Sequence, residues 1–421
     1  MAEFGDRAPA PERLHALDAV RGFALLLGIV FHATISFVPA PAPIWIVEDS
    51  HRSTALAVLF FAIHVFRMTT FFLIAGFFAH MSFHRRGAKA FIRDRLKRIG
   101  LPLLLGWPLV YAAIFAVVVW AAVSANGGHL PTTPRRPWPT FPKFPLTHLW
   151  FLYVLLEFYL GVLILRAGVV LIDRTGRVRL IIDRLVSLVM RSPLAPVVLA
   201  LPLGVAFAVD PNWLMWFGVP TPDSSFVTNP QALIGFGAAF GFGWLLHRQA
   251  ELIRILERRW ALNLCLAIGL CAASLAIAGV TPQLTPIEDG VAALAGAGCY
   301  ALATWTATFA VIGLALRFLS GFSATRRYIA DASYWLYLIH LPIVMALQVA
   351  VSGLDWPWPV KFAAILAVAF PLMFASYQLL VRYSFIGGVL NGRRAPRNAA
   401  VRLQPQSPPS TPLAIRQETL G

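Results

Sequence analysis

An apolar run near the N-terminus carries three ionisable side chains. Residues 17–33 read LDAVRGFALLLGIVFHA and include Asp18, Arg21 and His32. The run is long enough to form most of a membrane-spanning helix, which needs about 20 residues. Charged groups inside a bilayer are costly and are usually found where they serve a function. This stretch therefore restricts the chain to a membrane fold with polar groups in its first helix.

Helical periodicity places these side chains on one face. Arg21 and His32 are eleven positions apart, which corresponds to about three turns and about 16 Å along a helix axis. Asp18, three residues before Arg21, can neutralise it, and Gly28 leaves room for another backbone or a ligand. We interpret the stripe as one wall of a polar channel. In the alternative interpretation, Asp18 and Arg21 only set the membrane topology, and His32 only packs between helices.

Composition identifies a polytopic membrane protein. Of 421 residues, 58% are hydrophobic and 13% are charged, more apolar surface than a soluble domain of this length could bury. The net charge of +16 could suit nucleic acid, but the basic residues lie in short loops, where they set helix orientation, so no nucleic-acid partner is expected. Three cysteines lie within apolar runs and form no disulfide or zinc motif, so we expect no metal. We also expect no cleavable secretory signal.

Apolar runs predict the number of helices. They occupy residues 17–38, 56–80, 101–124, 147–172, 194–209, 229–247, 261–279, 291–318, 333–352 and 360–382, and the run 194–209 is short and bracketed by prolines. If the N-terminus is inside, Lys and Arg concentrate in the inside loops, as the positive-inside rule requires. We therefore expect an all-α polytopic membrane bundle of about ten transmembrane helices with both termini cytoplasmic.

The second run carries a further histidine and arginine. His64 and Arg67 are three residues apart within FFAIHVFRMTTFFLIAGFF, so they point the same way. Arg67 lies too far inside the run to reach the membrane surface. A neutral imidazole can accept a proton, which makes His32 a candidate general base if the two helices meet.

The loop FIRDRLKRIG is strongly basic. It carries Arg93, Arg95, Lys97 and Arg98 within six residues. Guanidinium groups at i and i+3, such as Arg95 and Arg98, can bind a phosphate through paired hydrogen bonds. The alternative is that the loop is only a positive-inside topology signal.

Two later runs carry polar side chains on helix faces. Trp150 and Glu157 are seven residues apart in HLWFLYVLLEFYLG, and His148 begins that helix. Tyr337 and His340 share a face in DASYWLYLIHLPIV. Each set could contact substrate or form an interhelical hydrogen-bond patch.

Two outer loops are predicted to be irregular or aromatic. The loop 125–146 has too many prolines for a helix. The loop 210–230 brings Trp213, Trp216 and Phe217 together between prolines. We interpret this group as an interfacial aromatic belt, and the alternative is a platform that stacks on sugars.

These motifs together resemble the acyltransferase-3 family of integral membrane acyltransferases. The resemblance rests on LDAVRG with ten residues between Arg21 and His32, on Arg95 and Arg98, and on FRMTTFFLIAGFF, HLWFLYVLLEFY and SYWLYLIHLPIV in order. It covers residues 14–385 and is strongest for the branch that contains glucans biosynthesis protein C, which is associated with succinyl decoration of periplasmic glucans. In one departure, Ala75 stands before Gly76 where the family commonly has serine, which puts a hydroxyl role there in doubt.

The resemblance implies an activity and a division of the chain. Residues 17–385 would form a transmembrane acyltransferase domain, between a cytoplasmic segment 1–16 and a disordered cytoplasmic tail 386–421. The domain would move an acyl group such as acetyl or succinyl from a cytoplasmic thioester, typically acyl-CoA, to a hydroxyl of a periplasmic or cell-surface glycan. The donor would be a co-substrate, no cofactor would be bound permanently, and the protein would lie in a bacterial inner membrane.

The expected site residues follow from the motifs and the resemblance together. His32 matches the family's catalytic histidine and Arg21 its paired arginine, and Arg67 or Arg21 could stabilise an oxyanion. The candidate catalytic residues are Asp18, Arg21, His32, His64, Arg67 and Glu157. The candidate donor-binding residues are Arg93, Arg95, Lys97 and Arg98, and the candidate substrate-binding residues are His148, Trp150, Tyr337 and His340. An acyl-histidine relay, a secondary transporter or translocase with a polar cavity, and a catalytically silent scaffold are the alternatives.

Overall fold

The computed structural model describes residues 11–130 and 139–392. Within these ranges the regular secondary structure is helical, and the only β pairing is one isolated bridge between Lys143 and Ser225. The helices are α1 (Pro11–Thr34), α2 (Thr54–Arg95), α3 (Leu101–Ala125), α4 (Trp150–Ile172), α5 (Arg177–Arg191), α6 (Ala195–Ala208), α7 (Pro230–Arg248), α8 (Ile253–Arg258), α9 (Trp260–Ala278), α10 (Gly290–Phe318), α11 (Ala324–Ser352), α12 (Trp358–Ser376) and α13 (Phe385–Leu390). Short 3-10 turns occupy Ile35–Phe37, Thr147–Leu149, Met215–Phe217 and Ala250–Leu252, and π-turns occupy Leu96–Gly100 and Tyr377–Val381.

Helices occupy all ten predicted apolar runs, which confirms the all-helical polytopic bundle. By length and composition, seven helical segments of the described chain could cross a membrane, or eight if α5 and α6, which meet at 106°, form one bent span. The predicted number of ten transmembrane helices differs from this count because α2, a π-turn and α3 are counted as one segment of 72 residues. At about 1.5 Å per residue this segment exceeds a bilayer core of about 30 Å several times over, so it can hold two predicted runs. The short α6 and the glycine-rich α7 are not counted as separate spans.

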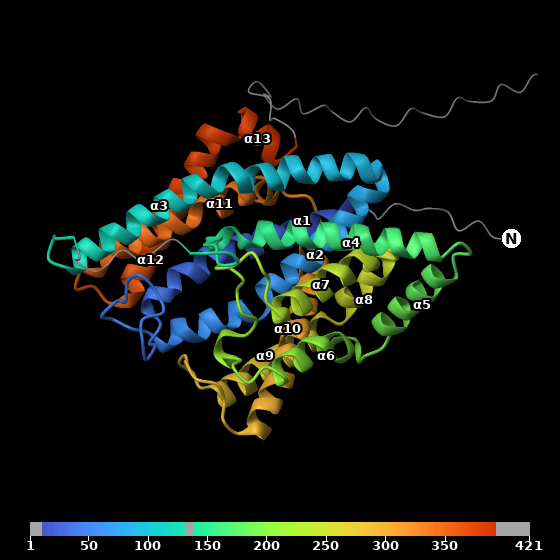
Figure 1. Cartoon of the computed structure of the whole chain (residues 1–421), viewed down its shortest axis with the longest axis horizontal. Helices are drawn as coiled ribbons and strands as arrows, with labels where there is room; N and C mark the ends of the chain where they lie inside the picture. Colours follow the sequence, from blue (N-terminus) through green and yellow to red (C-terminus); the bar gives the residue numbers. More distant parts are fainter. Residues whose placement is uncertain (1–10, 131–138, 393–421) are drawn as a thin grey trace, which may run out of the picture.

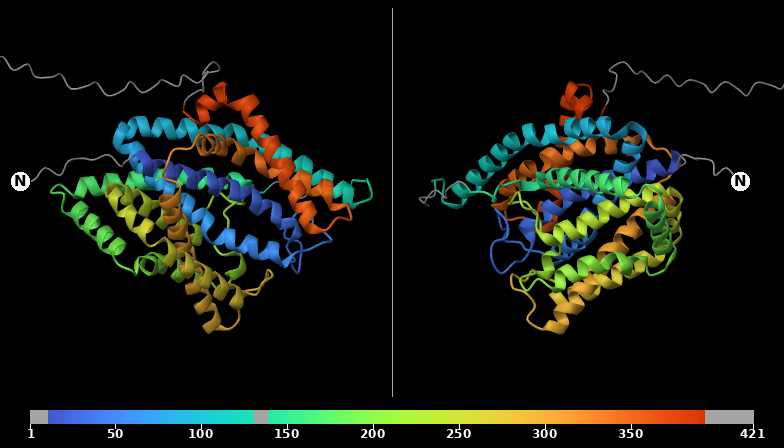
Figure 2. Two further views of the ribbon diagram at one scale, coloured as in Figure 1. Left: turned by 180° about the vertical axis from the view of Figure 1, so that it is seen from behind. Right: turned by 45° about the vertical axis from the view of Figure 1, so that its right-hand side comes forward.

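The two ends of the bundle differ in charge. Figure 1 places the α2–α3 and α4–α5 turns at its right, and the loop 38–53 at its left. The arginine-rich sequence 85–98 lies in the first of these turns. We call the end with this turn the basic end and the end with the loop 38–53 the loop end. Figure 2 shows from two further sides that α1, α2, α4 and α11 run together through the middle of the bundle.

Close helix packing sets the bundle's core. α2 packs extensively against α7, and α1 against α11. At the α2–α7 crossing, a Cβ on Gly76 would collide with the carbonyl oxygen of Phe240, and one on Gly243 with that of Leu73. Small residues let two backbones approach this closely inside a membrane. This contact fixes α2, which carries Arg67, within the core.

Several boundaries differ from the sequence prediction. α1 begins at Pro11, so residues 11–16 belong to the first helix rather than to a separate segment. α5 is an amphipathic helix where a loop was expected, because its charged residues alternate with apolar ones at helical spacing. α13 occupies part of the expected tail 386–421. Residues 1–10 and 393–421, on which the rest of the segment and tail predictions fall, lie outside the described residues.

Candidate functional site

A cavity of about 400 Å³ lies at the basic end, between α1, α2, α4 and α11. Six arginines line it, and they are Arg21, Arg85, Arg86, Arg95, Arg98 and Arg327. Two carboxylates, Asp18 and Asp331, line it as well. The cationic excess suits a polyanionic ligand. We call this space the basic cavity.

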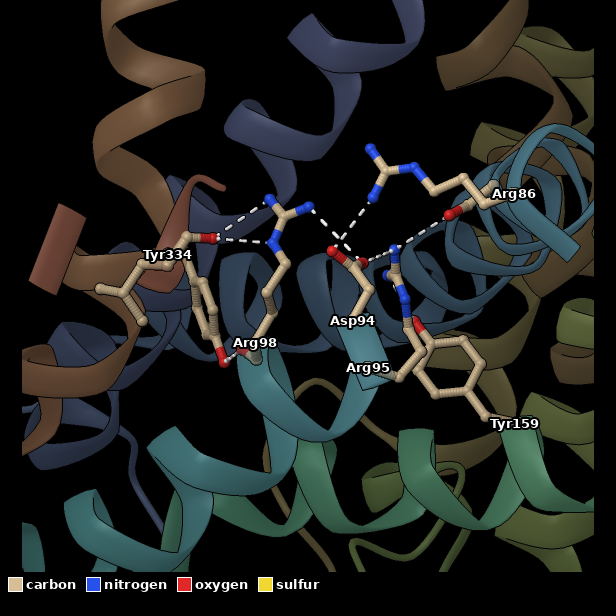
Figure 3. A network of polar contacts seen from close by, with 8 residues as sticks. Arg86, Asp94, Arg95, Arg98, Tyr159 and Tyr334 are labelled. Carbon is tan, nitrogen blue, oxygen red and sulfur yellow. Dashed lines mark hydrogen bonds and ion pairs between the residues drawn. The ribbon is translucent and has the colours of Figure 1, made fainter. Parts of the chain in front are cut away.

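One carboxylate holds three of the arginines at the mouth of the basic cavity (Figure 3). Asp94 contacts Arg95 at 2.7 Å, Arg86 at 3.2 Å and Arg98 at 3.8 Å. Arg98 also donates through Nε and Nη2 to the carbonyl oxygen of Leu390, at 3.3 and 3.2 Å. Both donors of Arg98 therefore face one oxygen, and a phosphate could offer each of them an oxygen of its own.

Two tyrosines fix the same arginines from the helices around them. Tyr334 of α11 donates its hydroxyl to the backbone oxygen of Arg98 at 2.7 Å. Arg95 lies over the ring of Tyr159 of α4, with its guanidinium carbon 5.5 Å from the ring centroid. Figure 3 shows Arg95 and Arg98 held between these neighbouring helices. The pair is therefore part of the packed bundle rather than of a free loop.

The face of α1 that carries Asp18, Arg21 and His32 contributes to both cavities. Its N-terminal end forms part of the wall of the basic cavity, and its C-terminal end lies deeper in the bundle. Asp18 lies 3.2 Å from Arg21 and 3.6 Å from Arg327 of α11. These side chains are 21 to 38% exposed, so solvent screens the ion pairs and they add little stability. Further along α1, Gly28 and His32 line a second cavity.

This second space is a small inner cavity of about 40 Å³ that neighbours the basic cavity. Four residues line both cavities, and they are Leu25, Phe71, Phe151 and Tyr337. The inner cavity is also lined by His32, Arg67, His148, Trp150 and His340. The structure thus places the predicted histidine in a cavity next to the one that the arginines line.

Unpaired polar atoms gather around the inner cavity. Among the described residues, Nδ1 of His32, Nε of Arg67, Nδ1 of His148 and Nε2 of His340 are buried without a hydrogen-bond partner. Buried polar atoms are nearly always paired in proteins, so four unpaired atoms around one small space favour a polar ligand there.

Backbone contacts orient two of the imidazoles. Nε2 of His148 lies 3.2 Å from the carbonyl oxygen of Leu338, and Nδ1 of His340 lies 2.7 Å from that of Tyr337. A carbonyl oxygen can only accept, so each of these ring nitrogens carries the hydrogen in a neutral imidazole. The other nitrogen of each ring is then an acceptor. The rings of His32 and His340 lie 5.2 Å apart.

Arg67 is a half-buried cation whose Nε is buried, and it has no ion-pair partner in the part of the chain that the structure describes. Its guanidinium carbon lies 4.6 Å from the ring centroid of Phe31, and its Nη1 occupies the space beside Gly28. A ring face compensates a desolvated cation only in part. Arg67 can therefore stabilise negative charge that develops beside His32.

Four predicted site residues lie outside both cavities. His64 faces the carbonyl oxygen of Val219 at 3.4 Å. Glu157 accepts a hydrogen bond from the hydroxyl of Thr228 at 2.6 Å, and so ties α4 to the loop that precedes α7. Arg93 and Lys97 are exposed on the outer side of the α2–α3 turn. The structure therefore does not bring these four side chains into either cavity.

The tryptophans of the loop 210–230 form neither a surface belt nor a sugar platform. Trp213 and Trp216 are 6% and 1% exposed. Trp213 donates to the carbonyl oxygen of Gly218 at 2.8 Å, and Trp216 stacks on Phe60 with centroids 5.2 Å apart. Both rings pack in the core because the loop folds inward between α2 and α10.

Several residues at the basic cavity were not predicted to belong to a functional site. Arg85, Arg86 and Arg327 were counted only as inside charges, and Asp94 was not singled out. Asp94 and Arg98 are four residues apart, a spacing that predicts a helical ion pair, and this signal could have been used. No group of three or more His, Cys, Asp or Glu within residues 11–130 and 139–392 is placed to hold a metal ion.

Comparison with known proteins gives a family match and partial relatives. A family model described as "Acyltransferase domain" matches residues 14–378. Proteins named glucans biosynthesis protein C from Salmonella paratyphi B, Salmonella heidelberg and Salmonella enteritidis PT4 are each 31% identical over 156 residues, which is 35% of this chain and 37% of theirs. The alignment thus spans little more than a third of these curated relatives. No solved structure matches.

Proposed function

This chain belongs to the acyltransferase family whose domain spans residues 14–378, and on that basis we propose that it moves an acyl group from a cytoplasmic acyl-CoA-type thioester to a hydroxyl of a periplasmic or cell-surface glycan. It is an integral membrane protein, and we place it in a bacterial inner membrane. The glycan acceptor is suggested by the partial relatives, whose name refers to glucan biosynthesis.

One observation supports the proposal, namely that the basic cavity, lined by the arginines, and the inner cavity, lined by His32, lie next to each other and share four lining residues. The phosphates of a CoA-type donor would bind Arg95 and Arg98 and displace the Leu390 carbonyl oxygen from Arg98. The narrow thioester arm would follow the stripe of Arg21, Leu25 and Gly28 into the bundle. A cationic mouth raises the local concentration of such a polyanion.

His32 acts as the general base in the proposed reaction. It accepts the proton of the acceptor hydroxyl while the hydroxyl oxygen bonds to the thioester carbonyl carbon. The tetrahedral intermediate then breaks its C–S bond, and the proton returns from the imidazolium to the leaving thiolate. The products are the acyl ester and the free thiol, and His32 is neutral again.

Arg67 is placed better than Arg21 to stabilise the oxyanion. Arg67 lines the inner cavity with His32, whereas Arg21 lines the basic cavity and pairs with Asp18. An unpaired guanidinium that is already desolvated needs little reorganisation when negative charge develops beside it. Arg21 then contributes to the binding of the donor.

The test compares acylation of envelope glycans in host cells that carry the native protein, His32→Ala or the matched surface variant His129→Ala. Mass analysis is expected to show loss of the acyl mass with His32→Ala and normal modification with His129→Ala. Normal modification by His32→Ala at normal protein level would overturn the proposal and favour the translocase alternative. Incubation with donor alone separates direct transfer from a relay, because only an acyl-histidine relay leaves acylated His32.

A further inference from the structure

The ring of Trp45 covers His32 at the loop end of the bundle. The two rings lie 5.9 Å apart and are inclined by 24°. His32 lines the inner cavity, and Trp45 lines neither the inner nor the basic cavity. The imidazole therefore lies between the inner cavity and Trp45, which is itself half-buried in the loop 38–53.

Gln348 of α11 holds this cover in place. The indole Nε1 of Trp45 donates to Oε1 of Gln348 at 2.8 Å. Nε2 of the same amide donates to the backbone oxygens of His32 and Ala33, at 2.9 and 3.3 Å. α1 ends at Thr34, so these oxygens lack partners within their own helix. One buried amide thus caps the helix that presents His32 and fixes the ring that covers it.

The segment that carries Trp45 is held at its two ends and is irregular between them. Lys361 of α12 donates to Asp49 at 2.7 Å, and both side chains are buried. Arg52 donates to the carbonyl oxygen of Ala40 at 3.0 Å. Residues 41–48 form neither helix nor strand. Rotation of Trp45 away from His32 would therefore break its hydrogen bond, its ring contact with His32 and its packing against the core, and would require no change of helical structure in the loop that carries it.

An acceptor needs a route to His32 that the donor does not fill. We propose that Trp45 is the movable cover of the acceptor entrance, held closed by Gln348, and that a hydroxyl-bearing acceptor reaches His32 from the loop end when Trp45 turns away. This inference rests on the proposed function, because it assigns a side to the second substrate. Trp45 is then a positioning residue that acts through access to His32.

Cysteine accessibility tests the cover without any need for turnover. The full-length protein with His32→Cys is treated with a membrane-impermeant methanethiosulfonate cation in intact cells and in inside-out vesicles. The chain with His32 intact gives the background from Cys265, Cys271 and Cys299. Adding Trp45→Ala is expected to speed labelling of position 32 in intact cells at least about tenfold. Adding Trp45→Phe, which loses the hydrogen bond and keeps a smaller aromatic ring, is expected to speed it about fivefold. Adding Trp356→Ala, at an exposed tryptophan of another loop, should leave the rate unchanged.

Two labelling results would overturn the inference. Fast labelling with Trp45 present would mean that nothing covers His32, and unchanged labelling in intact cells with both Trp45 variants would place the entrance elsewhere. Trp45→Phe keeps an aromatic ring at this position and is expected to fold. The labelling test can therefore be decided with Trp45→Phe even if Trp45→Ala fails to fold. Gln348→Leu removes the same hydrogen bond and also the cap on α1, so it is expected to label at least as fast as Trp45→Phe does.

Kinetics separate failure of the cover from failure of the proposed function. In the chain with His32 intact, Trp45→Phe should change the acceptor KM and the ratio of donor hydrolysis to transfer, and leave the donor KM within about twofold. A change confined to the donor KM would contradict the inference. If the Trp45 variants are labelled faster but the chain with His32 intact transfers no acyl group, the result would support the cover and reject the proposed transferase function.

Discussion

Arg67 occupies the space that a side chain at position 28 would fill. A Cβ atom on Gly28 would lie 2.5 Å from Nη1 of Arg67, and the guanidinium carbon lies over Phe31 at 4.6 Å from its ring centroid. Because Gly28 of α1 has no side chain, the guanidinium of Arg67 of α2 has room beside the inner cavity that His32 lines. The glycine was predicted to leave room for a backbone or a ligand, and the structure fills the room with a guanidinium.

Gly28→Ala is expected to lower kcat/KM by roughly 100-fold while the protein stays folded. The added methyl group meets the flexible end of Arg67 rather than backbone, so the guanidinium moves instead of the helix. A shift of about 1 Å in a catalytic group costs on the order of 100-fold in rate. Steady-state kinetics and thermal unfolding in detergent measure the two effects. Gly22→Ala on the same helix, whose Cβ would have its nearest contact at 3.5 Å, should change neither, and an equally active Gly28→Ala would contradict a role for Arg67.

Gly76→Ala is expected to prevent folding rather than catalysis. Its Cβ would collide with the carbonyl oxygen of Phe240, which belongs to the backbone of α7 and cannot move aside. Overpacking of this kind costs about 1–3 kcal/mol or more. The yield of monodisperse protein and its unfolding temperature should both fall. Gly241→Ala on α7, which has open space around it, is the control, and a stable Gly76→Ala variant would contradict the close crossing.

Much of the helical architecture could be predicted because a bilayer leaves the backbone few choices. An apolar run in lipid must satisfy its own hydrogen bonds, so the runs became helices. The features that were missed depend on contacts between distant segments. The 106° angle between α5 and α6 and the docking of α13 near Arg98 are set by packing, which no local pattern encodes.

Arg95 and Arg98 are expected to bind the donor, whereas Arg93 and Lys97 are not. Hydrogen bonds to a charged group contribute about 1.5–3 kcal/mol each, so Arg95→Ala and Arg98→Ala should each raise the donor Kd about tenfold or more. Both variants should also weaken the dependence of binding on salt. Isothermal titration with a non-hydrolysable CoA thioether measures this affinity. Arg93→Ala and Lys97→Ala on the same turn are matched controls, and an equal loss in all four variants would indicate diffuse attraction instead of a binding site.

The candidate site could be predicted only along single helices. The spacing of Asp18, Arg21 and His32 was sufficient because the period of one helix determines their shared face. The meeting of His32 with His340 and Arg67 joins three helices, and the sequence does not specify which faces meet. Trp213 and Trp216 were misinterpreted for the same reason, since aromatic residues between prolines look alike whether the loop folds into the core or lies at the membrane surface.

Glu157→Gln is expected to keep transfer activity within about twofold of the native protein, because a residue outside the reacting groups has only small effects. The glutamine oxygen can still accept the hydrogen bond that Thr228 donates to Oε2 at 2.6 Å. Glu157→Ala removes this acceptor and should destabilise the protein by about 1 kcal/mol. The matched change on the other partner, Thr228→Val, should reproduce that loss of stability and leave kcat unchanged. A large fall in kcat for Glu157→Gln, with normal thermal stability and an altered pH profile, would instead return this carboxylate to the catalytic group.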